Sequence, residues 1–168
     1  VACGRLRCIH QPLTDKKINM RKIARLIFEN KLVYALYRLF HALRAVMIDF
    51  RSHIRMRALI KNVERKASCH FTVEIKYGEN IHLGYHSSVG PYGCLGAKSK
   101  ITIGQYVRIS RGVIIETAGL DLSQPTPYPH TSKPITIEDG VWIASNAVIL
   151  GGVTIGKNAI IGAGAMVS

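Results

Sequence analysis

A six-residue repeat runs through the second half of the chain and restricts the folds that this half can adopt. Starting from Phe71, with two extra residues before Ile103 and a longer insertion before Ile137, every sixth residue is apolar. The fourteen positions are Phe71, Tyr77, Leu83, Val89, Leu95, Ile103, Ile109, Ile115, Ile137, Ile143, Ile149, Ile155, Ile161 and Val167. A six-residue unit is too short for a hairpin or a helix-containing repeat, so each unit is interpreted as one short strand plus one corner.

Glycine and small side chains follow the apolar positions at fixed distances. Glycine directly follows seven of the fourteen, and a small or β-branched residue stands four positions after almost every one. We expect the large apolar side chains to fill the interior and the small ones to let the chain bend closely at the corners, where glycine tolerates unusual backbone angles. Coils stacked about 4.8 Å apart then hydrogen-bond to the coils above and below.

Three segments of the repeat carry a family resemblance. Ile137–Ile143, Val153–Asn158 and Ile161–Gly164 resemble segments of the hexapeptide-repeat acyltransferases, particularly the sugar O-acetyltransferases of the galactoside, maltose and colanic-acid type. The resemblance covers residues 71–168 and implies a mainly β fold, a left-handed parallel β-helix with between four and five coils. We expect this domain to follow an α-helical region over residues 1–70.

The positive charge is concentrated in the first region. Of the net charge of +13, residues 1–70 carry +12, from 16 basic and 4 acidic residues, whereas residues 71–168 carry +1, from 7 and 6. The four cysteines show no CxxC pairing, and no secretory signal or membrane-spanning segment is recognised. We therefore expect a cytoplasmic protein, with the inner face of the cell membrane as a site of peripheral attachment.

An amphipathic pattern in the basic region predicts a helix with one apolar stripe. Apolar residues recur at alternating steps of three and four, and Arg44, Arg51 and Arg55 lie on one flank. The stripe consists of Val33, Leu36, Phe40, Leu43, Met47, Phe50 and Ile54. It is expected to pack on the rest of the protein or on a subunit, or to lie on an anionic membrane. Nucleic acid is disfavoured as a partner because no nucleic-acid-binding motif accompanies the charge.

The repeat is interrupted between Ile115 and Ile137 by a loop, residues 118–134, that holds four of the six prolines. A long excursion from a regular solenoid is often functional. The resemblance implies that this loop reaches a cleft shared with the next subunit of a homotrimer, where acetyl-CoA lies between neighbouring β-helices. It also implies an acetyl-CoA-dependent transfer to a sugar hydroxyl, in which a histidine accepts the hydroxyl proton. Surface-polysaccharide or lipid-linked glycan synthesis is the expected context.

The resemblance also indicates where the site residues should lie. Leu120 occupies the position at which related enzymes carry the catalytic histidine. His130, in the same loop, is the candidate replacement. His86 is the fallback candidate, and His82 is a further candidate on the coils. Histidine suits this role because its usual pKa lies near neutrality. Cys94 is expected to be an interior residue rather than a nucleophile.

The acetyl-CoA groove is expected to involve four residues of the last coils. By resemblance these are Trp142, Ser145, Ala163 and Ser168, and no metal is implied. The chain stops within a coil, so a truncated C-terminus is expected. Two alternatives remain open. One is an N-acyltransferase acting on an amino sugar or a nucleotide sugar, and the other is a non-catalytic β-helix trimer that has lost the usual histidine.

Overall fold

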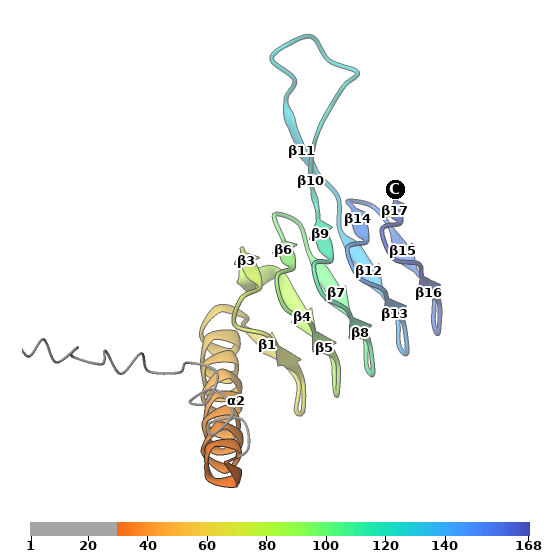
Figure 1. Ribbon diagram of the computed structural model, residues 1–168. Helices are drawn as coiled ribbons and strands as arrows, with labels where there is room; N and C mark the ends of the chain where they lie inside the picture. Colours follow the sequence, from red (N-terminus) through yellow and green to blue (C-terminus); the bar gives the residue numbers. More distant parts are fainter. Residues whose placement is uncertain (1–29) are drawn as a thin grey trace, which may run out of the picture. The chain divides into compact units, whose positions relative to one another are not determined.

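The computed structural model describes residues 30–168 of the chain. Residues 43–168 form one compact unit, which includes the helix α2 (Lys31–Leu59) from residue 43 onward. The unit 43–168 is a parallel β-helix of five coils, each made of three short strands (Figure 1). No described helix combines the length and the apolar character needed to span a membrane.

Three five-stranded parallel sheets form the sides of the β-helix, and we number them in the order in which each coil visits them. The first sheet contains β1 (Asn62–Val63), β4 (Ile81–Leu83), β7 (Ile101–Ile103), β12 (Ile135–Ile137) and β15 (Thr154–Ile155). The second contains β2 (Ser68–Cys69), β5 (Ser88–Val89), β8 (Arg108–Ile109), β13 (Trp142–Ile143) and β16 (Ile160–Ile161). The third contains β3 (Glu74–Lys76), β6 (Cys94–Gly96), β9 (Ile114–Glu116), β14 (Val148–Leu150) and β17 (Met166–Val167).

The interior is filled by apolar columns that run from coil to coil. In the first sheet, for example, Val63, Leu83, Ile103, Ile137 and Ile155 are register partners in successive coils. From Leu83 onward the twelve repeat positions are the inward-facing positions of the structure, and most of them are fully buried. The predicted fold class, mainly β with a parallel β-helix after a helical region, is therefore confirmed.

The prediction that the first two repeat positions, Phe71 and Tyr77, face the interior was wrong. The inward residues of the first coil are Val63, Cys69 and Ile75, whereas Phe71 and Tyr77 lie at corners, and Tyr77 is 54% exposed. A second pair of extra residues causes the shift, because the corner between the third and first sheets is lengthened in the first coil as well as in the second. In the first coil it holds a short 3₁₀ turn, Gly78–Asn80. The β-structure consequently begins at Asn62, inside the segment 1–70 that was expected to be helical.

The end of α2 covers the open end of the β-helix. Met56 and Ile60 are buried in the same apolar cluster as the coils. Arg55 Nη1 donates to the carbonyl oxygens of Phe71 (2.9 Å) and Val73, and the Phe71 amide donates to a serine hydroxyl of the same helix (3.0 Å). The first coil has no coil beneath it, so these contacts protect backbone and apolar groups that would otherwise face water.

Several glycines are needed because successive coils approach each other closely. A Cβ atom on Gly84 would lie 2.4 Å from the carbonyl oxygen of Gly104 in the next coil. The glycines that need a positive φ are a different set, which includes Gly112 and Gly140. The expectation that glycines following the apolar position serve unusual backbone angles was therefore wrong for Gly84, where the space between coils decides.

Replacing Gly84 with alanine is expected to lower the free energy of unfolding by about 1–3 kcal/mol, because the backbone of the neighbouring coil must move. Gly156 is the matched control, since nothing lies within 4 Å of a Cβ built there and its φ is not positive. Urea unfolding of both variants measures the difference. Equal stability of Gly84→Ala and Gly156→Ala would contradict the close-approach explanation.

Candidate functional site

The insertion forms a hairpin that projects from the corner between the third and first sheets (Figure 1). The strand β10 (Ala118–Leu120) pairs in antiparallel fashion with β11 (His130–Ser132), and the chain rejoins the stack at β12. A three-residue ladder of this kind holds the stem of the hairpin in one register. The position of each stem residue relative to the coil is thereby fixed.

A hydrogen-bonded network anchors the stem to the coils below. Thr117 is buried, and its hydroxyl donates to the Gly96 carbonyl (2.8 Å) and accepts from the Ser99 amide (3.0 Å). The hydroxyls of Ser99 and Ser132 lie 2.7 Å apart, so one donates to the other. Both strands of the stem are therefore tied to the coil that precedes the insertion.

His130 and Leu120 stand directly opposite each other across the hairpin. Directly opposed residues of an antiparallel pair lie on the same face, with their Cβ atoms about 4.5–5.5 Å apart. Both side chains are exposed, Leu120 by 48%. The structure therefore places the candidate histidine beside the position that the resemblance assigned to the base. The sequence gives no signal for this pairing, because it depends on where the hairpin turns.

A cavity of about 220 Å³ lies at the base of the hairpin. Its walls include Gly119, Thr131 and Lys133 from the stem and Leu150 and Gly151 from the following coil. These residues offer hydroxyl, ammonium and backbone groups to a polar ligand. The cavity lies on the coil side of the stem, next to the strand end where the fourth coil leaves the third sheet.

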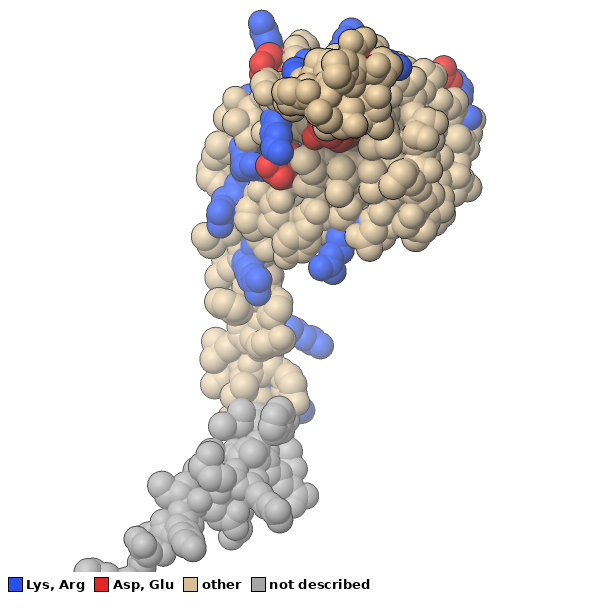
Figure 2. Space-filling model, turned by 90° about the horizontal axis from the view of Figure 1, so that it is seen from above, with Lys and Arg blue, Asp and Glu red and all other residues tan. Residues whose placement is uncertain are grey.

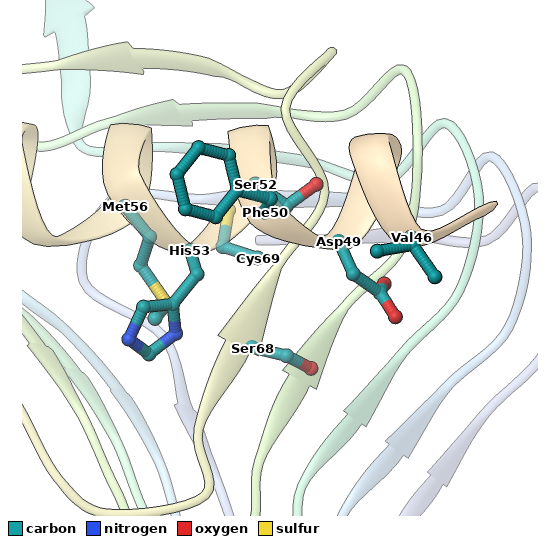
Figure 3. Close-up of a pocket in the computed structure, with 8 residues that line it drawn as sticks. All are labelled: Val46, Asp49, Phe50, Ser52, His53, Met56, Ser68 and Cys69. Atoms are coloured by element: carbon teal, nitrogen blue, oxygen red, sulfur yellow. The ribbon is translucent and has the colours of Figure 1, made fainter. Parts of the chain in front are cut away.

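A larger cavity of about 560 Å³ lies between α2 and the first coil (Figure 3). Phe50, His53 and Met56 from the helix and Cys69 from the coil contribute to its walls. Burial raises the pKa of the Cys69 thiol to about 12, so this sulfur remains protonated and is a poor nucleophile. The larger cavity therefore offers no thiolate nucleophile.

The other candidate histidines are held in structural contacts. His86 lies at the corner between the first and second sheets, where its carbonyl accepts from Arg108 Nη1 (2.6 Å). His82 Nε2 lies 3.4 Å from Glu64 Oε1. Cys94 is not an interior residue as expected. It is half-buried on the outward side of the third sheet, between Glu74 and Ile114, and partial burial together with the Glu74 carboxylate raises its pKa.

The four residues expected along the acetyl-CoA groove lie on the fourth and fifth coils. Trp142 projects from the second sheet, 49% exposed, and its Nε1 donates to a serine hydroxyl (3.1 Å). Ser145 and Ala163 occupy equivalent places at the corner between the second and third sheets, and Ser168 follows β17. The second sheet does not reach the corner that carries the hairpin. One chain therefore does not bring His130 together with Trp142.

Comparisons with known proteins place this repeat and fold among acetyltransferases. Residues 134–168 match the family described as bacterial transferase hexapeptide (six repeats). The galactoside O-acetyltransferase of Escherichia coli (strain K12) is 36% identical over 104 residues, which cover 57% of this chain and 48% of that protein. The chain spans about half the length of the curated relatives it matches.

Solved structures agree with this placement. A maltose O-acetyltransferase from Clostridium difficile 630 is 32% identical, with a TM-score of 0.62 over 67% of this chain and 62% of that chain. A hexapeptide-repeat containing acetyltransferase from Vibrio cholerae O1 biovar eltor, solved with acetyl coenzyme A, is 26% identical, with a TM-score of 0.60 over 83% of this chain and 80% of that chain. The predicted resemblance to hexapeptide-repeat acetyltransferases is confirmed.

Proposed function

We propose that this chain, whose repeat and fold are those of hexapeptide-repeat acetyltransferases, transfers an acetyl group from acetyl-CoA to a sugar hydroxyl. The observation that carries the proposal is the register of the hairpin, which places His130 opposite Leu120. The similarity to galactoside and maltose O-acetyltransferases supports both the acyl donor and the acceptor class. The synthesis of a surface polysaccharide or a lipid-linked glycan is the proposed setting.

In the proposed reaction His130 accepts the proton of the acceptor hydroxyl as its oxygen attacks the thioester carbonyl. The new C–O bond forms, the C–S bond of acetyl-CoA breaks, and coenzyme A leaves as the thiol. No covalent enzyme intermediate is needed, in keeping with the protonated state of the described thiols Cys69 and Cys94. The hairpin stem holds the base, while the anchored network below it keeps the stem in place.

A homotrimer is part of the proposal because one chain separates the two halves of the site. His130 stands at the corner between the third and first sheets, whereas Trp142, Ser145 and Ala163 lie on the second sheet or at its far edge. A hairpin from one subunit that reaches the second sheet of its neighbour brings them together. Acetyl-CoA then lies along Trp142, Ser145, Ala163 and Ser168 of that neighbour. Light scattering of the purified chain measures this state.

Thiol release from acetyl-CoA in the presence of candidate saccharides tests the activity. We expect release that depends on the saccharide and scales with protein concentration. Amino sugars are included as acceptors, because a preference for an amine over a hydroxyl would assign the chain to N-acyl transfer instead. A chain that neither binds acetyl-CoA nor releases thiol with any acceptor would favour the non-catalytic β-helix.

We further propose that the apolar stripe of α2 lies on an anionic membrane surface. Among its members, Leu43, Met47 and Phe50 are 57%, 65% and 66% exposed. The hydrogen bonds and the buried contact with the first coil come from Ser52, Arg55 and Met56, and Phe50 borders the cavity beside them. Leu43, Met47 and Phe50 therefore keep most of their surface exposed, which supports a partner for this face.

Basic side chains accompany the stripe. Between Lys31 and Leu59 the helix carries six basic residues and one acidic residue, Asp49. Figure 2 shows Lys and Arg side chains along this helix, separated by surface that is neither basic nor acidic. An exposed apolar face with a basic border is typical of helices that lie in the headgroup region, where each basic residue contributes about 1 kcal/mol.

A further inference from the structure

The outward face of the second sheet carries polar and aromatic side chains along four coils. In register along this face stand Ser68, Ser88, Arg108 and Trp142, one from each of four successive coils. Their chain neighbours in the strands point into the core, as the alternation of a strand requires. The two serines leave the floor of the face shallow over the first two coils. Ser68 also lines the cavity beside α2, and from Ser88 onward the side chains at the neighbouring corners border this face.

A cluster of three rings, one pair stacked and two pairs edge-to-face, forms one edge of this face. Tyr85, His86 and Tyr106 lie at the corner between the first and second sheets, with all three pairs of ring centroids 5.6 Å apart. Lys66 Nζ lies 5.7 Å from the centroid of Tyr85. Tyr106 is 53% exposed, so part of its ring is open to a ligand. This edge combines flat apolar surface with positive charge.

The opposite edge repeats the combination. Tyr92, at the corner between the second and third sheets, is 62% exposed, and the guanidinium of Arg111 lies 5.0 Å from its ring centroid. Below it, the guanidinium of Arg51 lies 4.5 Å from the ring centroid of Phe71. Aromatic and basic groups therefore border the outward face of the second sheet on both sides.

The backbone at these corners shows that the rings are not there to form the turn. His86, Tyr106 and Tyr92 have φ values of 59°, 56° and 61°, a left-handed conformation that is unfavourable for bulky side chains. The equivalent corner residues of the fourth and fifth coils are Gly140, Asn158, Asn146 and Gly164. Glycine and asparagine adopt this conformation readily. The turn itself therefore favours smaller residues, and the aromatic rings require another explanation.

The positive charge on this face is not neutralised within the described part of the chain. Arg108 Nη1 donates to the carbonyl of His86 (2.6 Å) and to the hydroxyl of Ser88 (3.3 Å), both uncharged groups. The ion pairs found within residues 30–168 involve neither Arg108 nor Arg111. Glu64, at the nearby corner, accepts from the Tyr85 amide (2.9 Å) and faces a histidine on the first sheet. Two guanidinium groups thus remain available to an anion.

We propose that this face binds an anionic saccharide over the first three coils, and that this saccharide is the acceptor of the proposed acetyl transfer. The sugar rings lie against Tyr106 and Tyr92, which offer large flat surfaces. Arg108 and Arg111 pair with a carboxylate or a phosphate on the sugar, for which the planar guanidinium is well suited. The acceptor role, but not the binding itself, rests on the proposed function.

Trp142 connects this face with the proposed acetyl-CoA groove, because it is the register partner of Arg108 in the following coil. A saccharide on the first three coils therefore points toward the coils where the acyl donor is proposed to lie. Single-stranded nucleic acid also stacks on aromatic side chains beside arginines. A saccharide is favoured because the similar acetyltransferases are named for sugar acceptors.

The first test separates ligand binding from folding. Replacing Tyr106 or Tyr92 with glycine, the residue that the fourth and fifth coils use at Gly140 and Gly164, relieves the left-handed backbone. We expect an unchanged or higher melting temperature together with saccharide affinity lowered about tenfold. A lower melting temperature with unchanged affinity would assign the rings to packing and overturn the proposal.

The second test identifies the ligand by calorimetric titration of the full chain without acetyl-CoA. The probes are an oligogalacturonate, a glycosyl phosphate, a neutral malto-oligosaccharide and an oligothymidylate. We expect at least one anionic saccharide to bind about tenfold or more tightly than the neutral one, and Arg108→Gln with Arg111→Gln to remove that preference. Comparison of the oligogalacturonate with the glycosyl phosphate shows whether the face binds a carboxylate or a phosphate. Arg57→Gln is the control variant, because it removes one positive charge from an exposed position of α2 that lies outside this face.

Equal binding of neutral and anionic saccharides, or an anionic preference that survives both glutamine changes, would overturn the proposal. Tighter binding of the oligothymidylate would assign the face to nucleic acid instead. These readouts do not depend on catalysis. Failure of the proposed acetyl transfer, seen as no thiol release with any acceptor, is therefore distinguishable from failure of this inference.

Discussion

Replacing His130 with alanine is expected to lower kcat for acetyl transfer by about a hundredfold or more, because general-base catalysis by a positioned histidine contributes about 10²–10⁴-fold. The side chain is exposed and takes no part in the core, so the fold and the oligomeric state should not change. Thiol release at saturating acetyl-CoA and acceptor measures kcat, and light scattering verifies the assembly. Unchanged turnover would exclude His130 as the base.

The register of the hairpin provides a sharper form of the same experiment. Leu120 faces the same side as His130 and pairs with it directly, so a histidine at position 120 is within reach of the same acceptor hydroxyl. Adding Leu120→His to the His130→Ala variant should restore much of the lost turnover. If His130 had only a structural role, the added histidine at position 120 would not restore turnover.

His86→Ala tests the fallback candidate. If His86 is the base, kcat falls in His86→Ala. In that case the kcat of His130→Ala stays at the level of the unmodified protein. If it belongs instead to the ring cluster at the edge of the second sheet, the KM for the acceptor rises while kcat is retained. His53→Ala, an exposed histidine of α2 that belongs to neither the hairpin nor the ring cluster, serves as the control for loss of an imidazole.

Replacing Met47 and Phe50 together with glutamate is expected to lower binding to anionic vesicles about a hundredfold, since each buried apolar side chain of this size contributes about 1.5–3 kcal/mol. Co-sedimentation with phosphatidylserine-containing vesicles measures this loss, and neutral phosphatidylcholine vesicles measure the contribution of charge. Ala45→Glu is the control for the added charge, because residue 45 lies on the opposite side of the helix from the stripe.

Two results would contradict the membrane proposal. One is vesicle binding that survives the double glutamate change. The other is a change in oligomeric state without any effect on vesicles, which would show that the stripe packs against another copy of the chain. Because the stripe does not contribute to the buried cluster that includes Met56 and Ile60, a loss of binding in the double variant should not be accompanied by unfolding.

The sequence predicted the part of the fold that repeats, and missed the parts that do not. From Leu83 onward every repeat position faces inward, because a strict period with large apolar residues leaves one solution for the backbone. The first coil was misplaced because its corner is lengthened, and Tyr77 happens to be apolar at the wrong position. Local composition does not reveal the length of a corner.

The site was predicted in its parts and not in its arrangement. The proline-rich insertion and His130 stood out in the sequence, but the pairing of His130 with Leu120 depends on the turn that closes the hairpin. The aromatic edges of the second sheet were also missed, because residues such as His86 and Tyr92 become neighbours of one face only when the coils are stacked. A signal existed in the sequence, since rings stand where later coils have glycine or asparagine.

The alternation of inward and outward side chains has a consequence for how such a protein changes over time. Within each coil the residues that hold the stack together and the residues that meet a ligand point to opposite sides of the same strand, as Ile109 and Arg108 do. An outward residue of a strand can therefore be exchanged without repacking the interior. The ligand preference of such a scaffold can diverge through single substitutions in the outward positions while the fold stays the same.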